Sequence, residues 1–585
     1  MKMKLKIYIG LALVLVQLSG CNQYLTEVNP NEMSTGSFWK NLDDANSGLT
    51  AVYNSFKNPQ ILAFQEEYNR SDMTYPGYGR PTNTDVYYLQ TFNNGSPAPN
   101  NKWTTLYTGI FRANQVLESL DKLLPTYSDS VSIKRGRAIK AQAHFFRGLF
   151  YSYLHNSFNQ GSVPIFDFVP QGESQFYQDL QPSDIVLDFY RKDLEYAKAN
   201  LPAKWTNAMD LGRVTSGAAT AVLGMSYLYE KNYDKAASYF KDVIENPSYG
   251  YKLTPSIGDN FSTKAEFNEE SILEIGYSID YKAQVGPWAE EQVASNYNVF
   301  ISPVGGNRAI YPSCWLIMAY KKEEMDKNDA RNYVVDPSGT KRLRTYSLRT
   351  SYSIVVPDDI DMPYYQLLPA QAANFNGGAT GYFRKYTNWE TLRSEKDIVP
   401  NQRSGINVRV IRLADVYLMY AECLIKGGTD ESGVNGALQY INKVRHRSAL
   451  KLLGQASDSE FPAAEHDNKV YTASAIMEHL MYVERPLELS LEGHAIRHLD
   501  LRRWGITKQR FEEVSKKQYF GDIYWYTNVA GKKAFQWTSI LKEGTNPSYT
   551  TLQDNVQAAK NYIASEHAYW PLPNNEILTN PVVLK

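Results

Sequence analysis

The residues best suited to do chemistry are concentrated in the run ERPLELSLEGHAIRHLDLRRWG, residues 484–505. The run contains four carboxylates and two histidines, namely Glu484, Glu488, Glu492, Asp500, His494 and His498. Two carboxylates can hydrolyse a glycosidic bond, and two histidines four residues apart on one helical face can bind zinc together with a carboxylate. Arginines stand close to these acids, at Arg485, Arg497, Arg502 and Arg503. Because ion pairs explain the same residues, we predict a structural network here, with no catalytic pair and no metal site.

No stronger catalytic signature occurs elsewhere in the sequence. The chain has no G-x-S-x-G nucleophile elbow, no G-x-x-x-x-G-K-[ST] phosphate loop and no H-E-x-x-H zinc helix. We therefore expect a protein that is not an enzyme and needs no cofactor. A glycosidase that uses Glu488 and Glu492 is kept as an alternative.

The elements that would position a functional site are mainly helices. Residues 217–250 follow the 34-residue tetratricopeptide pattern, with Leu223, Gly224 and Tyr227 in the first helix and Phe240 in the second. Other helices with apolar faces are expected at 104–124, at 141–154 with 183–202, and at 414–427 with 436–450. One such pair cannot bury its own apolar face, so the pattern predicts about four stacked helix pairs.

Three stretches interrupt this helical rhythm, at about 72–103, 250–315 and 330–405. They are rich in Gly, Pro and aromatic residues, and runs typical of short strands occur at 352–356 and 407–413. Long irregular segments in a compact protein usually carry function. The sequence thus predicts a mainly α fold, in which a helical scaffold carries a loop-rich half with a few short strands.

The first 21 residues indicate where the protein works. Lysines precede an apolar run at 7–18, and the run leads into LSGC, which ends at Cys21. The run is shorter than the roughly 20 residues that cross a bilayer, and the layout is typical of a secretory signal. A cysteine at the cleavage site is typical of a bacterial lipoprotein, in which Cys21 carries acyl chains. We expect residues 1–20 to be removed and the mature chain to be tethered to a membrane by Cys21.

Composition limits the partners of the chain. A net charge of −1 and the lack of a basic run argue against nucleic acid. Cys423 lies in an apolar helical pattern and is expected to be a buried thiol, while a bridge between Cys314 and Cys423 stays open. Aromatic residues make up 13% of the chain, including 44 Tyr and 10 Trp. Such rings can stack on the C–H face of a sugar and can donate or accept hydrogen bonds at their polar edges.

Several motifs together resemble the SusD/RagB family of outer-membrane nutrient-binding lipoproteins. The run at 484–505 is similar to the C-terminal signature of that family. VIRLADVYLMYAECL with YINKVRHRS is similar to its second hallmark, and WTTLYTGIFRANQVL and AQAHFFRGLFYSYL are similar to its early helices. GRVTSGAATAVLGMSYLY resembles its central repeat helix, and WPLPNNEILTNP resembles its closing segment. These motifs occur in the family's order over nearly the whole mature chain.

The resemblance implies one domain, residues 21–585, in which four tetratricopeptide-like helix pairs carry the ligand-binding half. The scaffold would cover 38–70, 103–250 and 408–515, and the loop-rich insertions would cover about 72–102 and 250–405. The resemblance also implies a non-catalytic protein on the outside of the outer membrane. Such a protein binds an oligosaccharide and delivers it to a SusC-like TonB-dependent transporter.

Binding sites in the family draw on aromatic residues of the early loop and the middle insertion, so we select candidate ligand contacts there. The early loop supplies Tyr75, Tyr78 and Arg80. The middle insertion supplies Trp288, Tyr297, Tyr311 and Trp315, with Asn307 and Arg308 to bond sugar hydroxyls. Trp389 and the Tyr364/Tyr365 pair are second choices, whereas Trp504 and Trp570 belong to the structural motifs. Two further alternatives are peptide capture by the same fold and a helical scaffold that binds only partner proteins.

Overall fold

The computed structural model describes residues 38–77, 84–279, 293–398 and 403–583. Long helices dominate these ranges, and the strands between them are short. The expected fold class, mainly α with a few short strands, is confirmed.

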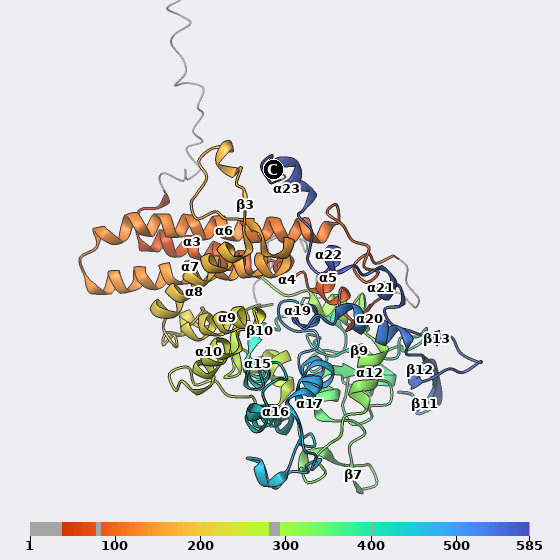
Figure 1. Ribbon diagram of the computed structural model, residues 1–585. Helices are drawn as coiled ribbons and strands as arrows, with labels where there is room; N and C mark the ends of the chain where they lie inside the picture. Colours follow the sequence, from red (N-terminus) through yellow and green to blue (C-terminus); the bar gives the residue numbers. More distant parts are fainter. Residues whose placement is uncertain (1–37, 78–83, 280–292, 399–402, 584–585) are drawn as a thin grey trace, which may run out of the picture.

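Eight helices form a continuous array that runs down the left side of the molecule (Figure 1). They are α3 (Leu42–Lys57), α6 (Pro97–Leu123), α7 (Ser130–Ser157), α8 (Ser183–Asn200), α9 (Ser216–Tyr229), α10 (Tyr233–Glu245), α15 (Leu413–Leu424) and α16 (Val434–Arg447). Each helix packs against the next one in this order. Taken in pairs they give α3/α6, α7/α8, α9/α10 and α15/α16, in agreement with the predicted four helix pairs.

The α9/α10 pair shows why the repeat pattern folds in this way. A Cβ atom at Gly224 would lie only 2.6 Å from the ring of Phe240, so the glycine lets the two helices approach closely. Asn232 begins α10 by accepting a hydrogen bond from the N–H of Lys235. Ala236 and Phe240 are fully buried between the helices.

Helix α6 begins at Pro97, whereas the predicted scaffold resumed at 103. Proline is favoured in the first turn of a helix, because its missing N–H has no partner there in any case. The early irregular segment is therefore shorter than the predicted 72–102. The predicted strand-like runs contain β8 (Ile354–Val355) and β10 (Val408–Arg412), so the run at 352–356 is a strand over two residues only.

The strands form six small antiparallel sheets within the described ranges. Five of them are two-stranded, namely β1 (Thr74–Pro76) with β5 (Ile310–Pro312), β2 (Val163–Pro164) with β3 (Leu180–Gln181), β4 (Ser271–Ile275) with β10 (Val408–Arg412), β6 (Tyr333–Val335) with β7 (Lys341–Leu343), and β8 (Ile354–Val355) with β9 (Tyr382–Phe383). The sixth joins β11 (Tyr519–Thr527), β12 (Lys533–Glu543) and β13 (Thr551–Leu552), at the right of Figure 1.

Shorter helices connect the scaffold and these sheets or lie at their edges. They are α4 (Pro59–Leu62), α5 (Phe64–Asn69), α11 (Tyr297–Ile301), α12 (Cys314–Lys321), α13 (Leu348–Ser353), α14 (Pro369–Ala372), α17 (Ala473–His479), α18 (Arg485–Glu488), α19 (Ile496–Arg503), α20 (Thr507–Lys516), α21 (Val556–Asn561), α22 (Ala564–His567) and α23 (Asn574–Thr579). One large apolar core, which reaches from Leu42 to Trp570, joins the scaffold to the loop-rich half.

The acids of 484–505 lie in a buried ion-pair network, as predicted, but several of their partners come from outside the run. Glu484 pairs with Arg349 and Arg445, Glu488 with Arg412 and Arg447, Glu492 with Arg412 and Lys385, and Asp500 with Arg485 and Arg503. Burial of these charges is tolerated because each carboxylate faces at least one cation. The network ties the run to β10 and α16.

The two histidines of this run do not share a helical face. Ala495 has a φ of 52°, in the left-handed region, so α19 begins only at Ile496. His494 stacks on Tyr153 with ring centroids 3.8 Å apart. Burial lowers the pKa of His494 and of His498 well below the ordinary value, so both imidazoles are neutral. No group of three or more His, Cys, Asp or Glu side chains in the described part of the chain is placed to hold a metal ion.

Cys314 and Cys423 are both buried thiols, and no disulfide joins them. The expectation for Cys423 is therefore confirmed, and the alternative of a bridge is wrong. Within residues 38–77, 84–279, 293–398 and 403–583, no helix is both long enough and apolar enough to cross a membrane.

Candidate functional site

Two segments that the sequence analysis selected meet in one small sheet. β1 pairs with β5, and Tyr75 lies directly opposite Tyr311. The pairing extends to Gly77, whose N–H donates to the carbonyl oxygen of Ala309 at 2.5 Å. The early segment and the middle insertion, which are far apart in the sequence, thus form one surface, which we call the β1–β5 junction.

The selected aromatic residues that the structure describes are buried. Tyr75 is 2% exposed, Tyr297 3%, Trp315 4% and Tyr311 5%. The expectation that these four rings face a ligand is therefore wrong in this structure. Directly opposite residues of an antiparallel pair project to the same face, and Tyr75 and Tyr311 both project inward into a tyrosine-rich cluster.

Trp315 and Tyr297 support the fold instead. The indole Nε1 of Trp315 donates to the carbonyl oxygen of Asp72, and the guanidinium of Arg510 lies 4.3 Å from its ring centroid. Tyr297 stacks on Phe64 with ring centroids 4.3 Å apart. The sequence did indicate the burial of Trp315, because this residue belongs to the apolar run CWLIMAY, which forms the buried helix α12.

Asn307 and Arg308 are exposed at the outer end of the β1–β5 junction. Backbone hydrogen bonds hold their turn on both sides, from the N–H of Asn307 to Val299 and from the N–H of Ala309 to Phe300, both at 2.6 Å. Arg308 has a φ of 45°, a conformation that few non-glycine residues adopt. A held turn of this kind presents an amide and a guanidinium in a defined place.

The remaining selected residues, Cys21, Tyr78, Arg80 and Trp288, lie outside the described residues and stay predictions. The chain reaches Tyr78 through Gly77, where a Cβ atom would lie 2.1 Å from the carbonyl oxygen of Arg308. Only glycine fits where the early segment passes the Asn307–Arg308 turn.

Buried tyrosines support the junction from within. Tyr364, Tyr365 and Tyr382 are at most 1% exposed, and burial raises the pKa of each, so all three phenols are neutral. The second-choice pair Tyr364/Tyr365 is therefore internal. Trp389 is half-buried, and the guanidinium of Arg384 lies 4.4 Å from its ring centroid.

The most exposed tryptophans that the structure describes lie on the hairpin of β11 and β12, which the sequence analysis did not select. Trp525 is 50% and Trp537 55% exposed. Phe535 lies between them, with ring centroids 4.8 Å from Trp525 and 5.1 Å from Trp537. The sequence pattern that indicates this hairpin consists of two aromatic-rich runs of alternating character on either side of the turn NVAGKK.

The hairpin and the β1–β5 junction rest on the same tyrosine-rich cluster. Gln536 points inward, and its Oε1 accepts a hydrogen bond from the N–H of Phe375 at 2.6 Å. The Phe375 ring lies 5.1 Å from the Tyr382 ring, which in turn lies 5.4 Å from the Tyr311 ring. Exposed aromatic rings and the exposed polar turn are thus connected through one packed cluster.

A separate groove of about 680 Å³ lies between α6, the segment after α7 and α23. Its walls are mainly aromatic, formed by Tyr107, Phe111, Phe166, Phe168, Phe176 and Tyr177. The indole Nε1 of Trp103 donates to Glu576 at 3.1 Å and so ties α23 to α6. The groove offers more apolar than polar surface, and polar side chains such as Asn114 and Glu173 also line it.

The proposed acid and base of a glycosidase cannot reach a substrate. Glu488 is 0% and Glu492 2% exposed, and both pair with Arg412. Burial alone would raise the pKa of Glu488, but the guanidiniums of Arg447 and Arg412 lower it below its ordinary value. A carboxyl that is held ionised and covered by arginine cannot donate a proton to a sugar.

The fold and the site together define a class of protein in which a tetratricopeptide-like scaffold carries a loop-rich half. Comparison with known proteins agrees. The SusD family model matches residues 269–585, and a model described as starch-binding associating with outer membrane matches residues 23–228. The chain belongs to the SusD family.

Individual relatives resemble the chain over most of its length. It is 25% identical to SusD-like protein P25 of Formosa agariphila, over 86% of this chain and 90% of that protein. A SusD superfamily structure from Bacteroides vulgatus superposes with a TM-score of 0.69 at 24% identity, covering 93% of this chain and 98% of that one. A structure described as a laminarin-binding SusD-like protein superposes with a TM-score of 0.60 at 24% identity, covering 81% and 94%.

Proposed function

We propose that this protein binds an oligosaccharide or polysaccharide at the cell surface. The family supports a binding role, and the solved relative described as laminarin-binding supports a glycan as the ligand. Within the chain, the observation that carries the proposal is the pairing of β1 with β5. It joins both segments selected for ligand contact and leaves Asn307 and Arg308 exposed beside the point where the chain continues to Tyr78.

In this proposal the polar turn and the aromatic rings have different roles. The amide of Asn307 and the guanidinium of Arg308 bond sugar hydroxyls. Trp288 and Tyr78 stack on the C–H faces of sugar rings, and Arg80 adds a further donor. The exposed tryptophans of the β11–β12 hairpin extend the surface, because the hairpin rests on the same cluster as the junction.

Affinity electrophoresis through gels that contain a panel of polysaccharides tests the proposal. At least one glycan is expected to retard the protein. Arg308→Ala is expected to weaken binding by about 1.5–3 kcal/mol, as the loss of a charged hydrogen-bonding group does. Trp288→Ala is expected to cost about 1–3 kcal/mol, as the loss of a stacking platform does.

Arg135→Ala is the matched control for Arg308→Ala, since Arg135 is an exposed arginine on α7 in the scaffold. It is expected to migrate like the native protein. Folded native protein that no glycan retards would contradict the proposed function. Retention that survives both Arg308→Ala and Trp288→Ala would show that the ligand binds elsewhere.

We also infer that the bound glycan passes to a SusC-like TonB-dependent transporter, with the protein anchored through lipid on Cys21. The signal-like segment that ends at Cys21 and the family description support this arrangement. Cys21→Ala is expected to move the protein from the outer-membrane fraction to the soluble fraction. A TonB-dependent barrel is expected to co-purify with the native protein from detergent-solubilised membranes, and its repeated absence would contradict the partnership.

Peptide capture is a second candidate function, and the aromatic groove beside α6 is the observation that favours it. The aromatic walls can take up apolar side chains of a peptide, and the polar side chains beside them can bond its backbone. A peptide library screened against native protein and Phe176→Ser distinguishes the two functions. Peptides that bind the native protein and are lost in this variant would support peptide capture.

A further inference from the structure

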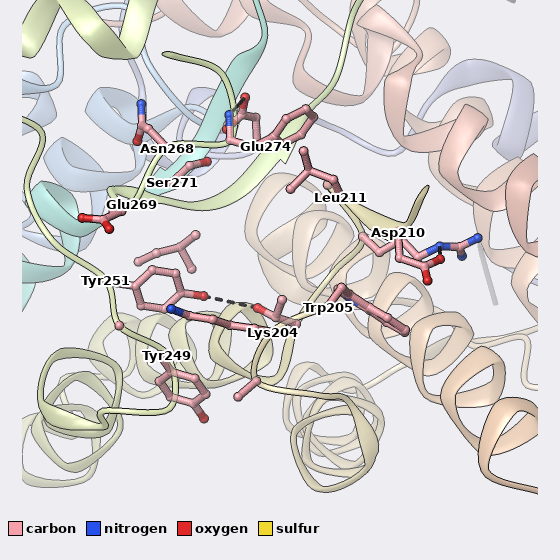
Figure 2. Close-up of a pocket in the computed structure, with 17 residues that line it drawn as sticks. Lys204, Trp205, Asp210, Leu211, Tyr249, Tyr251, Asn268, Glu269, Ser271 and Glu274 are labelled. Atoms are coloured by element: carbon pink, nitrogen blue, oxygen red, sulfur yellow. Dashed lines mark hydrogen bonds and ion pairs between the residues drawn. The ribbon is translucent and has the colours of Figure 1, made fainter. Parts of the chain in front are cut away.

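A second concave site lies within the scaffold half, and none of the residues selected as ligand contacts lines it (Figure 2). It is a cavity of about 280 Å³ at the place where three chain segments meet. These segments are the α8–α9 connection, the turn after α10, and the residues that lead into β4. None of the residues of the β1–β5 junction lines this cavity.

Three aromatic side chains form walls of the cavity and are held in place. The indole Nε1 of Trp205 donates to the carbonyl oxygen of Val214 at 3.0 Å. The hydroxyl of Tyr251 lies 3.2 Å from Thr215 Oγ1, the contact drawn as a dashed line in Figure 2. The ring of Phe267 packs against Gly212, a glycine with positive φ. Rings that are already held lose little freedom when a ligand stacks on them.

Glu274 supplies a buried acceptor among the residues that line the cavity. It is 9% exposed, and its Oε1 accepts hydrogen bonds from Asn407 Nδ2 at 2.6 Å and from the N–H of Phe267 at 3.2 Å. Its Oε2 accepts no hydrogen bond from the described residues, and Arg409 Nε lies 3.6 Å away. Because this oxygen is itself buried, Glu274 does not bond a ligand directly, and through the N–H of Phe267 it holds one wall of the cavity in place.

The exposed polar residues of the cavity indicate which charge a ligand can carry there. Glu269 and Lys204 are exposed at the cavity, while Asp210 and Arg213 neutralise each other in an ion pair of 2.7 Å. An anionic ligand would meet the exposed carboxylate of Glu269, and a cationic one would meet Lys204. A neutral ligand rich in hydroxyls avoids both repulsions, and its hydroxyls can donate to the carboxylate of Glu269.

We propose that this cavity binds one or two neutral sugar rings, as a second saccharide site separate from the β1–β5 junction. Its volume of about 280 Å³ lies just below the roughly 300–1,000 Å³ range of small-molecule sites, which suits a ligand of that small size. Aromatic walls stack on the C–H face of the ring, and hydroxyls donate to the exposed carboxylate of Glu269. The inference rests on the proposed function for the class of ligand only, since the location follows from the cavity itself.

Saturation-transfer NMR with single small molecules tests this site. The probes are neutral mono- and disaccharides, together with glucuronic acid and glucosamine as anionic and cationic comparators. A neutral sugar is expected to bind, and Trp205→Ala is expected to weaken its binding about tenfold or more. Trp39→Ala is the matched control, because Trp39 is a half-buried tryptophan of the scaffold that does not line the cavity, and it is expected to leave small-sugar binding unchanged.

Lys204→Ala provides a second variant whose folding is not at risk, since Lys204 is exposed at the mouth of the cavity. This variant is expected to weaken binding of the neutral sugar severalfold. The inference is overturned if no neutral sugar binds, if Lys204→Ala and folded Trp205→Ala both bind as the native protein does, or if a charged comparator binds best.

The two sites fail separately. If Arg308→Ala abolishes polysaccharide retention but keeps small-sugar binding, both proposals stand. If no polysaccharide is retained while the small sugar still depends on Trp205, the proposed function fails and the second site stands. If polysaccharide retention depends on Arg308 while no small sugar binds, only the second site fails.

Discussion

Replacing Arg412 by methionine should destabilise the protein far more than losing an ordinary surface ion pair. Arg412 is 1% exposed at the end of β10, and it reaches Glu492 at 2.5 Å, Glu270 at 2.7 Å and Glu488 at 2.8 Å. Methionine keeps most of the side-chain volume but leaves three buried carboxylates with too few cations. Removing one partner of a buried pair costs about 3–5 kcal/mol, and we expect a loss in that range.

Urea unfolding followed by circular dichroism measures this loss. Arg135→Met is the control, because its pair with Asp43 is exposed and should contribute about 0–1 kcal/mol. The double variant Arg412→Met with Glu492→Gln should lose less than the sum of its single changes, since the second change removes one of the uncompensated charges. A loss in Arg412→Met within about 1 kcal/mol of the control would refute the view that this network holds the signature run in place.

The same network predicts how stability depends on pH. Burial alone would raise the pKa of Glu270, but Arg447 and Arg412 lower it to about 2. Because the folded pKa lies below the unfolded one, ionised Glu270 stabilises the fold fully above about pH 4.5. This contribution is lost as the pH falls towards 2, and the acid-induced loss should be smaller in Arg412→Met.

Three further predictions concern other parts of the molecule. Gly77→Ala should weaken polysaccharide retention while helical circular dichroism stays unchanged, because its Cβ would lie 2.1 Å from the Arg308 carbonyl oxygen; native-like retention would contradict this. Trp537→Ala should change the free energy of unfolding by less than about 0.5 kcal/mol but weaken polysaccharide binding by about 1–3 kcal/mol. A calorimetric titration that shows no loss of affinity would mean that the hairpin is not part of the glycan-binding surface. Burial raises the pKa of Glu266 to about 7, so its folded form retains a proton that the unfolded form releases above about pH 4.5, and stability falls as the pH rises through this interval. Glu266→Gln should therefore raise the melting temperature at pH 8 but not at pH 4, and equal shifts at both values would contradict the assignment.

The helical scaffold could be predicted because its signals are local. In α9 and α10, apolar residues recur at helical spacing and a glycine stands where the helices touch, so one short window defines the pair. The strand β10 was likewise visible in NVRVIRL. The start of α6 at Pro97 does not follow from the sequence, because proline is common both in loops and in the first turn of a helix.

The accessible aromatic rings could not be predicted in the same way. Tyr75 and Tyr311 are buried because their two strands pair across a long stretch of sequence, and neither strand shows by itself which face turns inward. Aromatic content alone favoured both the buried Trp315 and the exposed Trp537 equally, since the same ring fills a core or stacks on a ligand. The cavity lined by Trp205 depends on three separated segments, and no motif indicates that they meet.

The central claim is that a glycan binds at the β1–β5 junction, and hydrogen–deuterium exchange with and without the retained polysaccharide tests it most directly. The account predicts slower exchange of the backbone amides at 305–311 and 74–77 when glycan is bound, and no such slowing in Arg308→Ala at the same glycan concentration. Protection confined to other parts of the chain, with these two segments unchanged in the native protein, would contradict it.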